Sequence, residues 1–383
     1  MRVKLKDVCT FYTGTGFPKK YQGQLSGTYP FYKVGDIANN VVSGKVYLEQ
    51  CNNYISEETL KLIKGSIIPK NTIVFAKIGE ALKLNRRAIT STDCLIDNNA
   101  MGIAAKSDKL RTLFFYYFMR NIKMELLAES TTVPSVRKSR LEAYEIDIPS
   151  LDEQKIIEGK LTILSKVINL KEKQLLKLDE LVKARFVEMF GDPVSNSKDL
   201  PVQKMNNVAP ICQYDGSFEE SVWLLNLDMV ESQTGRIINY NIVSKDEIGG
   251  SVCTFDENNV LYSKLRPYLN KVVIPDGKGY ATSELVPLRP DPKIINRIYL
   301  AYLLRSNEFV EMIKEKVAGA KMPRVSMSDF REFNVPVPPL ELQNQFASFV
   351  QEVDKSRLLN ICLKSLVESV LKIRIFSEYK KSS

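Results

Sequence analysis

The chain carries the same module twice, and this duplication constrains its architecture more than any other feature. The stretch IPSLDEQKIIEGKL at residues 148–161 is echoed by VPPLELQNQFASFV at residues 337–350. A constant offset of 189 residues relates Pro134 and Pro323, Val136 and Val325, Ser139 and Ser328, Pro149 and Pro338, Leu151 and Leu340, and Gln154 and Gln343. Small shifts extend the match upstream, where 75–89 aligns with 262–274 and 32–46 with 224–238. Solenoids repeat every ~20 to 50 residues, so this longer period indicates two copies of one module.

Each copy has the same order of segments. About 100 residues of short β-type runs come first, broken by Gly, Asn and Pro. An aromatic helical patch follows at 113–120 or 299–306, and a final strand then leads into a long helix. This order predicts an α+β fold, with two β-rich domains separated by an antiparallel coiled coil of two long helices and related by a pseudo-two-fold internal repeat. The predicted boundaries are 1–149 and 192–338 for the β-rich domains, and 150–191 and 339–380 for the helices.

The two predicted helices are long, and each carries an apolar stripe. In the first helix, a set of apolar residues has the alternating spacing of a heptad seam: Ile157, Leu161, Leu164, Ile168, Leu175, Leu178, Val182 and Met189. The second opens with Phe346, Phe349 and Val353 and ends, after a slip in phase, with Leu359, Leu363, Leu366, Val370 and Ile373. About 38 residues of helix would be ~57 Å long, too long for the core of one small domain. The stripes therefore favour an antiparallel coiled coil over a solvated linker helix.

Composition narrows the class of protein. Of the 383 residues, 44% are hydrophobic and 26% are charged, which provides enough apolar material for two domains and their connections. The apolar runs fall far short of the roughly 20 residues of a membrane span, and the N-terminus lacks the apolar core of a secretion signal. Six scattered cysteines form no C-x-x-C pair. They favour reduced thiols in a cytoplasmic protein over a zinc site or a disulfide framework.

Charge and the lack of histidine bear on function. The formal net charge of +9 fits an anionic partner such as nucleic acid. The chain has no histidine, the residue most often used as general base or metal ligand. The sequence contains neither a G-x-x-x-x-G-K-[ST] phosphate loop nor an N-P-P-[FY] tetrapeptide for base methylation. We therefore predict no catalytic residue, no cofactor and no metal site.

Basic residues gather at matching places in the two copies. Residues 61–90 carry seven basic side chains against one acid, Glu80, and Lys77 in this stretch aligns with Lys264. Specific DNA reading needs Lys and Arg for phosphates and polar side chains for base edges, although a merely solubilising surface would explain any single lysine. The candidate DNA-binding residues are Lys77, Lys83, Arg86, Arg87, Arg137, Lys138 and Arg140 in the first copy, and Lys264, Arg266, Asn270, Lys271, Lys321 and Arg324 in the second.

Several segments together resemble the specificity subunit of type I restriction–modification systems. They are TGTGFP…YPFYKVGDI within 13–37, the junction PSLDEQ at 149–154, the heptad helix, and its terminator FGDP at 190–193. The resemblance covers essentially the whole chain in the expected order. It implies that each β-rich domain is a target recognition domain that reads one half of a split sequence in double-stranded DNA. It further implies that the helices set the spacing and dock two methyltransferase subunits, that motor-nuclease subunits join the complex, and that the chain itself is not an enzyme.

Two other hypotheses stay open on the sequence alone. A coiled-coil scaffold with twin protein-binding domains would share the repeat and the helices but would not bind DNA. A self-contained enzyme would need catalytic residues that no motif reveals. Salt-sensitive DNA binding in the presence of a methyltransferase partner would separate a recognition subunit from both.

Overall fold

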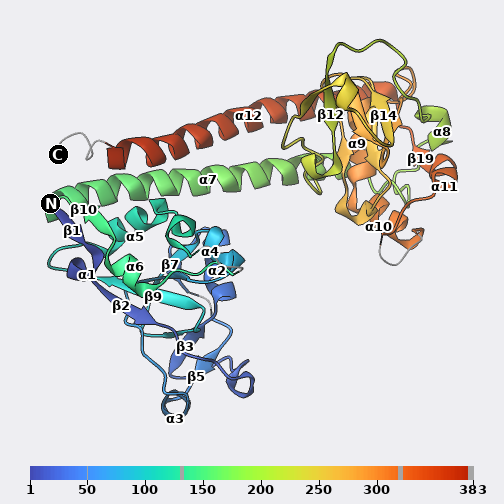
Figure 1. Ribbon diagram of the computed structural model, residues 1–383. Coiled ribbons are helices and arrows are strands. Elements are labelled where there is room, and N and C mark those ends of the chain that lie inside the picture. The colour runs from blue at the N-terminus through green and yellow to red at the C-terminus, as the bar shows by residue number, and fades with distance from the viewer. Residues whose placement is uncertain (50, 130–132, 318–321, 378–383) are drawn as a thin grey trace. The chain divides into compact units, whose positions relative to one another are not determined.

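The computed structural model describes residues 1–49, 51–129, 133–317 and 322–377. The chain divides into a first unit, Met1–Glu172 with Cys362–Ser383, and a second unit, Lys173–Ile361. Each unit contains a β-rich domain and parts of the long helices α7 (Leu151–Phe190) and α12 (Leu340–Ser377) (Figure 1). Within the described ranges, no helix is long and apolar enough to cross a lipid bilayer.

The first β-rich domain contains a mixed sheet with the strand order β2-β9-β6-β7-β4, a smaller sheet β5-β3-β8, and the pair β1-β10. The strands are β1 (Arg2–Lys4), β2 (Cys9–Thr13), β3 (Tyr29–Tyr32), β4 (Tyr47–Leu48), β5 (Tyr54–Ile55), β6 (Thr72–Ala76), β7 (Arg87–Thr90), β8 (Leu95–Ile96), β9 (Ala100–Ala105) and β10 (Glu145–Asp147). The helices and 3-10 turns are α1 (Leu5–Val8), η1 (Lys19–Tyr21), α2 (Val34–Val42), α3 (Glu57–Leu62), α4 (Glu80–Lys83), α5 (Thr112–Asn121), η2 (Met124–Leu127) and α6 (Lys138–Glu142).

The second β-rich domain contains the sheets β13-β12-β17-β14 and β16-β15-β18 and the pair β11-β19. The strands are β11 (Val202–Lys204), β12 (Ser221–Leu225), β13 (Ile242–Ser244), β14 (Val252–Phe255), β15 (Val260–Ser263), β16 (Val272–Val273), β17 (Gly279–Thr282), β18 (Leu285–Leu288) and β19 (Asn334–Pro336). The helices and 3-10 turns are α8 (Met205–Val208), η3 (Leu227–Met229), η4 (Lys245–Glu247), η5 (Pro267–Leu269), α9 (Arg297–Arg305), α10 (Asn307–Glu315) and α11 (Met327–Arg331).

A central strand in each domain is buried on both faces. In β6, Ile73 and Phe75 join the apolar cluster that includes α5, while Val74 joins a separate cluster. In β15, Tyr262 joins the cluster that includes α9, while Leu261 joins a separate one. Successive side chains of a strand point to opposite faces, so a short run of apolar residues is what a doubly covered strand requires.

Equivalent backbone contacts confirm the predicted internal repeat. Strand β1 pairs antiparallel with β10 just before α7, and β11 pairs antiparallel with β19 just before α12. The Val136 N–H donates to the Lys77 carbonyl at 2.9 Å, and the Val325 N–H donates to the Lys264 carbonyl at 3.0 Å. The residues that align in sequence therefore occupy the same place in the two domains.

A buried glutamine accounts for the first echoed junction. Gln154 lies in the first turn of α7 and has no exposed surface. Its side-chain oxygen accepts a hydrogen bond from the Arg111 N–H at 2.8 Å. Its side-chain nitrogen donates to the carbonyls of Lys109 and Pro149, both at 3.0 Å. The glutamine thus ties the start of the long helix to the segment that enters α5.

Gln343 makes the same three bonds in the second unit. Its oxygen accepts from the Asn296 N–H at 2.7 Å, and its nitrogen donates to the carbonyls of Ile294 (3.1 Å) and Pro338 (2.7 Å). It also has no exposed surface. The sequence repeats at this junction because each copy needs one side chain that can satisfy a backbone donor and two backbone acceptors at once.

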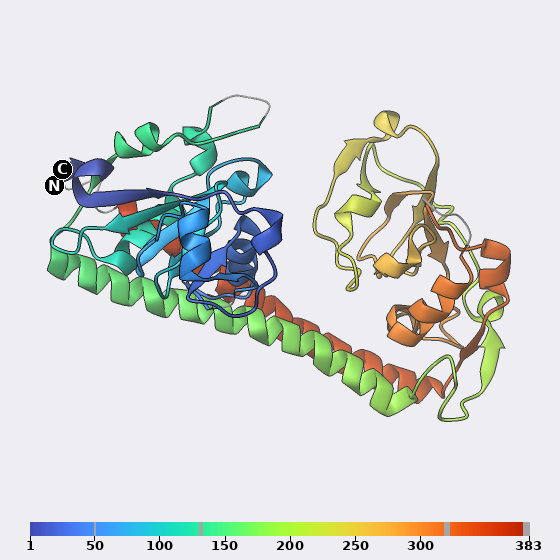
Figure 2. The same ribbon diagram turned by 90° about the horizontal axis from the view of Figure 1, so that it is seen from below.

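The two long helices run antiparallel, as predicted. In the second unit, the end of α7 lies beside the start of α12 (Figures 1 and 2), and the rings of Phe186 and Phe346 are 5.4 Å apart. Farther along the same two helices, Asp179 of α7 forms an ion pair with Arg357 of α12 at 2.6 Å. Falling residue numbers on α7 therefore meet rising numbers on α12. In the first unit, Glu172 of α7 pairs with Lys364 of α12 at 2.8 Å.

The predicted seam of α7 faces inward. The seam is buried at Ile157, Leu161 and Val182, and its remaining residues are half-buried: Leu164, Ile168, Leu175, Leu178 and Met189. The seam prediction left out Phe186 and Phe190, which are also buried and pack their rings against Phe346. Helix α7 has a further set of apolar residues, and these are exposed: Ile156, Ile163, Leu170, Leu176, Leu181 and Val187.

The predicted seam in the later part of α12 is wrong. Leu359, Leu363 and Leu366 are 61%, 38% and 62% exposed. The inward positions continue in phase from Phe346, Val350 and Val353 through a buried arginine, Arg357, and the half-buried Asn360, Lys364 and Val367. No slip in phase occurs there, because acidic residues of α7 pair with the inward basic residues. Val370 and Ile373 of that prediction lie outside the residues whose side chains the structure describes.

Candidate nucleic-acid interface

In each β-rich domain, two segments far apart in sequence form one basic edge. The segment after β6 meets the loop before α6: Ile78 forms a β-bridge with Ser135, and the Gly79 N–H donates to the Pro134 carbonyl at 2.8 Å. This edge brings Lys77 and Arg137 into one region of the first domain. We call this region the first basic edge, and we group with it the basic residues that follow along the chain: Lys83 and Arg86 after Gly79, and Lys138 and Arg140 on α6.

The second domain builds the same edge from aligned residues. Leu265 forms a β-bridge with Arg324, and the Arg266 N–H donates to the Pro323 carbonyl at 2.8 Å. The second basic edge therefore carries Lys264, Arg266 and Arg324. Lys321, the other basic residue predicted here, lies outside the described residues.

The basic side chains of the first basic edge differ in their exposure and in whether they are paired. Lys83, Arg137, Lys138 and Arg140 are exposed, while Lys77 and Arg86 are half-buried. Within the described part of the chain, the side chains of Lys77, Arg86 and Arg140 form no hydrogen bond or ion pair. The others are paired to nearby carboxylates: Lys83 with Glu80 (2.7 Å), Arg137 with Glu129 (2.7 Å) and Lys138 with Glu142 (3.5 Å). Exposed pairs of this kind stabilise a fold weakly, so their basic members can exchange partners at low cost.

The second basic edge is smaller. Arg266 and Arg324 are exposed, and Lys264 is half-buried. Arg324 binds the carboxylate of Glu284 at 2.8 Å, and this hydrogen bond lowers the pKa of Glu284 against the opposing effect of burial. The Lys264 N–H donates to the Glu284 carbonyl at 3.0 Å, so one acidic residue lies between the two basic segments.

Comparison with known proteins places the chain in a family. The model of the type I restriction modification DNA specificity domain matches residues 1–180 and 228–368. The chain belongs to this family. The first matched region covers the first β-rich domain and ends within α7, and the second covers most of the second β-rich domain and most of α12; each includes one copy of the buried-glutamine junction.

Relatives in the type I specificity family are similar at low identity. The EcoDI specificity subunit of Escherichia coli is 24% identical over 64% of this chain and 63% of its own length, so this chain spans less than two thirds of that relative. The MjaIX specificity subunit of Methanocaldococcus jannaschii is 21% identical over 98% of this chain and 93% of its own length. The crystal structure of the type I S subunit from M. genitalium is 14% identical and superposes with a TM-score of 0.56, covering 97% of this chain and 95% of that one. This last likeness shows the shared fold.

Arg87, one of the predicted contacts, is part of the core of this specificity-family domain. It is 1% exposed, and its guanidinium donates to the Asn85 carbonyl (3.2 Å), the Asn85 side chain (2.8 Å) and the Ile122 carbonyl (2.7 Å). Burial lowers the pKa of Arg87 to about 9. Because the guanidinium is enclosed, we leave Arg87 out of the proposed interface.

Asn270 and Lys271 also act within the fold. Asn270 is buried with a left-handed backbone (φ 51°), and its side chain donates to the Arg305 carbonyl at the end of α9 at 2.8 Å. Asn85 repeats this arrangement, with φ 54° and a bond to the Arg120 carbonyl at 3.2 Å. Lys271 donates to the Leu227 carbonyl at 2.6 Å. Asn85 and Asn270 fall within the aligned segments 75–89 and 262–274, and Asn is favoured where the backbone is left-handed.

Among the residues that the structure describes, neither edge has a candidate metal centre. In the part of the chain that the structure covers, no three Cys, Asp or Glu side chains gather closely enough to hold a metal ion.

Proposed function

We propose that the chain is the sequence-specific DNA-recognition subunit of a type I restriction–modification complex. Each β-rich domain reads one half of a bipartite target in double-stranded DNA, and the chain itself catalyses nothing. The supporting observation is the pair of basic edges, built by aligned residues in both copies of the module. A protein that reads two half-sites with two copies of one domain needs such a matched pair of surfaces.

The proposed DNA-binding residues are the basic residues of the two edges, together with Lys321. Those without a partner among the described residues are available to phosphates directly. The paired ones, such as Arg137 and Arg324, exchange a carboxylate for DNA. Such contacts with phosphates fix the position of a protein on the duplex, and contacts with base edges specify sequence.

The two long helices are proposed to set the distance between the half-sites. Half-sites that one protein reads from the same side of a duplex lie about one helical turn, roughly 34–36 Å, apart. Insertion of one heptad near Leu175 is expected to change the spacer of the target and to leave both half-sites unchanged. A methylation map of the variant tests this, and changed half-sites with an unchanged spacer would contradict it.

The same helices are proposed to dock two methyltransferase subunits, which motor-nuclease subunits join. Exposed apolar residues support this role. In the first unit, Ile156, Ile163 and Leu170 recur at heptad spacing on the outside of α7. A stripe at this spacing suits the packing of a partner helix, and exposed apolar surface of this kind commonly marks a protein interface.

Salt-dependent DNA binding tests the proposal. The chain is assembled with its methyltransferase subunits, and affinity for a target duplex is measured across a salt series. Lys77→Ala and Lys264→Ala are each expected to weaken binding and to reduce the salt slope by about one, because each removes a phosphate contact. Lys155→Ala, an exposed change in the first turn of α7, is the matched control. A wild-type complex without salt-sensitive DNA binding would instead favour a scaffold with twin protein-binding domains.

We further propose that the chain acts in the cytoplasm. A type I complex works on DNA that has entered or resides there, and the six cysteines of the chain are free thiols, as a reducing compartment favours.

A further inference from the structure

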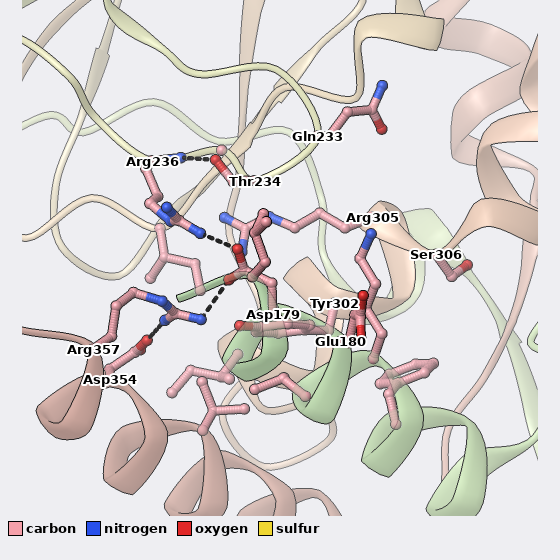
Figure 3. A pocket seen from close by; sticks show the side chains of 18 of the residues that line it. Asp179, Glu180, Gln233, Thr234, Arg236, Tyr302, Arg305, Ser306, Asp354 and Arg357 are labelled. Carbon is pink, nitrogen blue, oxygen red and sulfur yellow. Dashed lines mark hydrogen bonds and ion pairs between the residues drawn. The ribbon is translucent and has the colours of Figure 1, made fainter. Parts of the chain in front are cut away.

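One carboxylate in the second unit joins three separate elements. Asp179 lies on α7 and is bound by two guanidinium groups, as Figure 3 shows. One of its oxygens accepts from Arg236 at 2.5 Å and the other from Arg357 at 2.6 Å. Arg236 belongs to the loop between η3 and β13 of the second recognition domain, and Arg357 belongs to α12. We call this arrangement the Asp179 joint.

The Arg357 side of the joint is buried. Arg357 is 9% exposed and also bonds to Asp354, one turn earlier on its own helix. A buried cation is costly unless carboxylates surround it, and removing one of its partners leaves a charge that water cannot reach. The inward position of Arg357 therefore depends on Asp179 from the facing helix.

The Arg236 side is held rigidly by its own domain. The preceding residue, Gly235, has φ +65°, and a Cβ there would lie 1.7 Å from the Val272 carbonyl oxygen. The loop is thus pressed against β16. The same Val272 carbonyl accepts hydrogen bonds from the Arg305 side chain of α9, at 3.0 and 2.5 Å. Any movement of Arg236 relative to Asp179 is consequently a movement of the domain itself.

A cavity beside the joint leaves this side of the junction sparsely packed. Its volume is about 880 Å³, and it is lined by α7, the loop that carries Arg236, α9 and α12. Figure 3 shows Asp179 and Tyr302 on its wall. Open space cannot hold the second β-rich domain at a fixed angle to the helices, whereas two short charge-assisted hydrogen bonds can.

The first unit holds the equivalent loop through an uncharged contact with the helix that follows its own domain. The equivalent loop contains Gly44, which aligns with Gly235, and its carbonyl accepts a hydrogen bond from the Asn169 side chain of α7 at 3.1 Å. Lys45 stands where the second domain has Arg236, and it pairs instead with Glu49 of its own domain at 2.8 Å. Among the described residues, Lys45 pairs with no carboxylate of a long helix, so the module fold does not require the Asp179 joint.

We propose that Asp179 is a positioning residue that determines spacer specificity. By binding Arg236 and Arg357 together, it fixes the orientation of the second recognition domain on the helix pair. The idea rests on the proposed function, in which two half-sites are read at a set distance. Base pairs of DNA are stacked about 3.4 Å apart, so a domain that swings by a few ångströms reads a half-site one base pair away.

The test compares targets that differ in spacer length alone. The chain is assembled with its methyltransferase subunits, and affinities are measured for duplexes with the cognate spacer and with spacers one base pair longer or shorter. Asp179→Asn keeps the shape of the side chain and removes its charge. Arg236→Gln breaks the same bridge from the surface of the domain. Both are expected to reduce discrimination between spacers by about tenfold, which corresponds to about 1.4 kcal/mol, with unchanged base preference in each half-site.

Two controls make the outcome decisive. Glu180→Gln alters the next residue, whose exposed side chain pairs with Lys177 on the same helix at 2.6 Å, and it should keep wild-type discrimination. Trp223 fluorescence shows whether the second unit of each variant is folded. Retained discrimination in folded Asp179→Asn and Arg236→Gln, or an equal loss of affinity for every spacer, would overturn the proposal. A wild-type complex indifferent to the bipartite target would instead contradict the proposed function.

Discussion

Replacement of Gln343 by leucine should destabilise the second unit strongly. The leucine fills similar space but leaves three buried backbone groups without partners: the Asn296 N–H and the carbonyls of Ile294 and Pro338. A buried hydrogen bond contributes about 1 kcal/mol net, and an unsatisfied buried group costs about 1–3 kcal/mol. We therefore expect the free energy of unfolding to fall by about 3 kcal/mol. For a unit of this size, each kcal/mol lowers the Tm by ~2–4 °C, so the Tm should fall by about 10 °C.

Intrinsic fluorescence is a suitable assay, because the chain has a single tryptophan. Trp223 is buried in β12 of the second unit, so its emission reports unfolding where Gln343 lies. The control is Gln345→Leu, the same chemical change at an exposed position two residues later on α12. This control should stay within about 0.5 kcal/mol of the wild type.

Equal denaturation midpoints for Gln343→Leu and Gln345→Leu would refute the reasoning, since burial and bonding would then make no difference. The matching change Gln154→Leu removes the same set of bonds from the first unit. We expect a similar loss of stability in the first unit, which circular dichroism would measure.

Two further predictions concern the surface of the molecule. The first replaces Leu359, Leu363 and Leu366 by glutamate. Because the three side chains are exposed, each change should alter the stability of the isolated chain by no more than about 0.5 kcal/mol. The substitutions should nevertheless abolish co-purification with a methyltransferase subunit. Unaffected co-purification would place the docking surface elsewhere. The second prediction concerns Glu284, whose pKa is lowered by the hydrogen bond from Arg324. The stability that this pair contributes is therefore present above the ordinary carboxyl pKa of 4.5. It is lost as the pH falls through the lowered pKa of Glu284. The stability difference between the wild type and Arg324→Gln should therefore shrink in acid, and a difference independent of pH would contradict this.

The duplicated module and the long helices could be predicted because their signals are local or periodic. The fixed offset between Gln154 and Gln343 marks equivalent positions whatever those residues do. The alignment of Lys77 with Lys264 likewise located two equivalent edges. Most of what the glutamines bond to could not be read from the sequence, because two of the three partners of each come from the segment before the aromatic helix, more than forty positions away.

The roles of individual basic residues were less accessible. Arg86 and Arg87 are neighbours of the same type, yet the first is half-buried at the edge and the second is enclosed by backbone carbonyls. The two differ because one of the carbonyls that bind Arg87 belongs to Ile122, in a segment 35 residues away. Sequence composition shows a basic cluster, but only the fold determines which of its members face solvent.

The inner and outer faces of the later part of α12 were predicted wrongly for a physical reason. A search for apolar residues selects Leu359, Leu363 and Leu366, whereas the inward face there holds Arg357, Asn360 and Lys364. Arg357 is acceptable inside only because Asp179, 178 residues away, supplies a carboxylate. Charged pairs in a helix seam contribute little net stability, but they penalise every register that separates them. The seam therefore specifies how the helices align, while the exposed leucines gain nothing until another apolar surface covers them. On the proposed function, the paired charges set the register of the chain's own helices, and the exposed leucines are left for the docked methyltransferase subunits to cover.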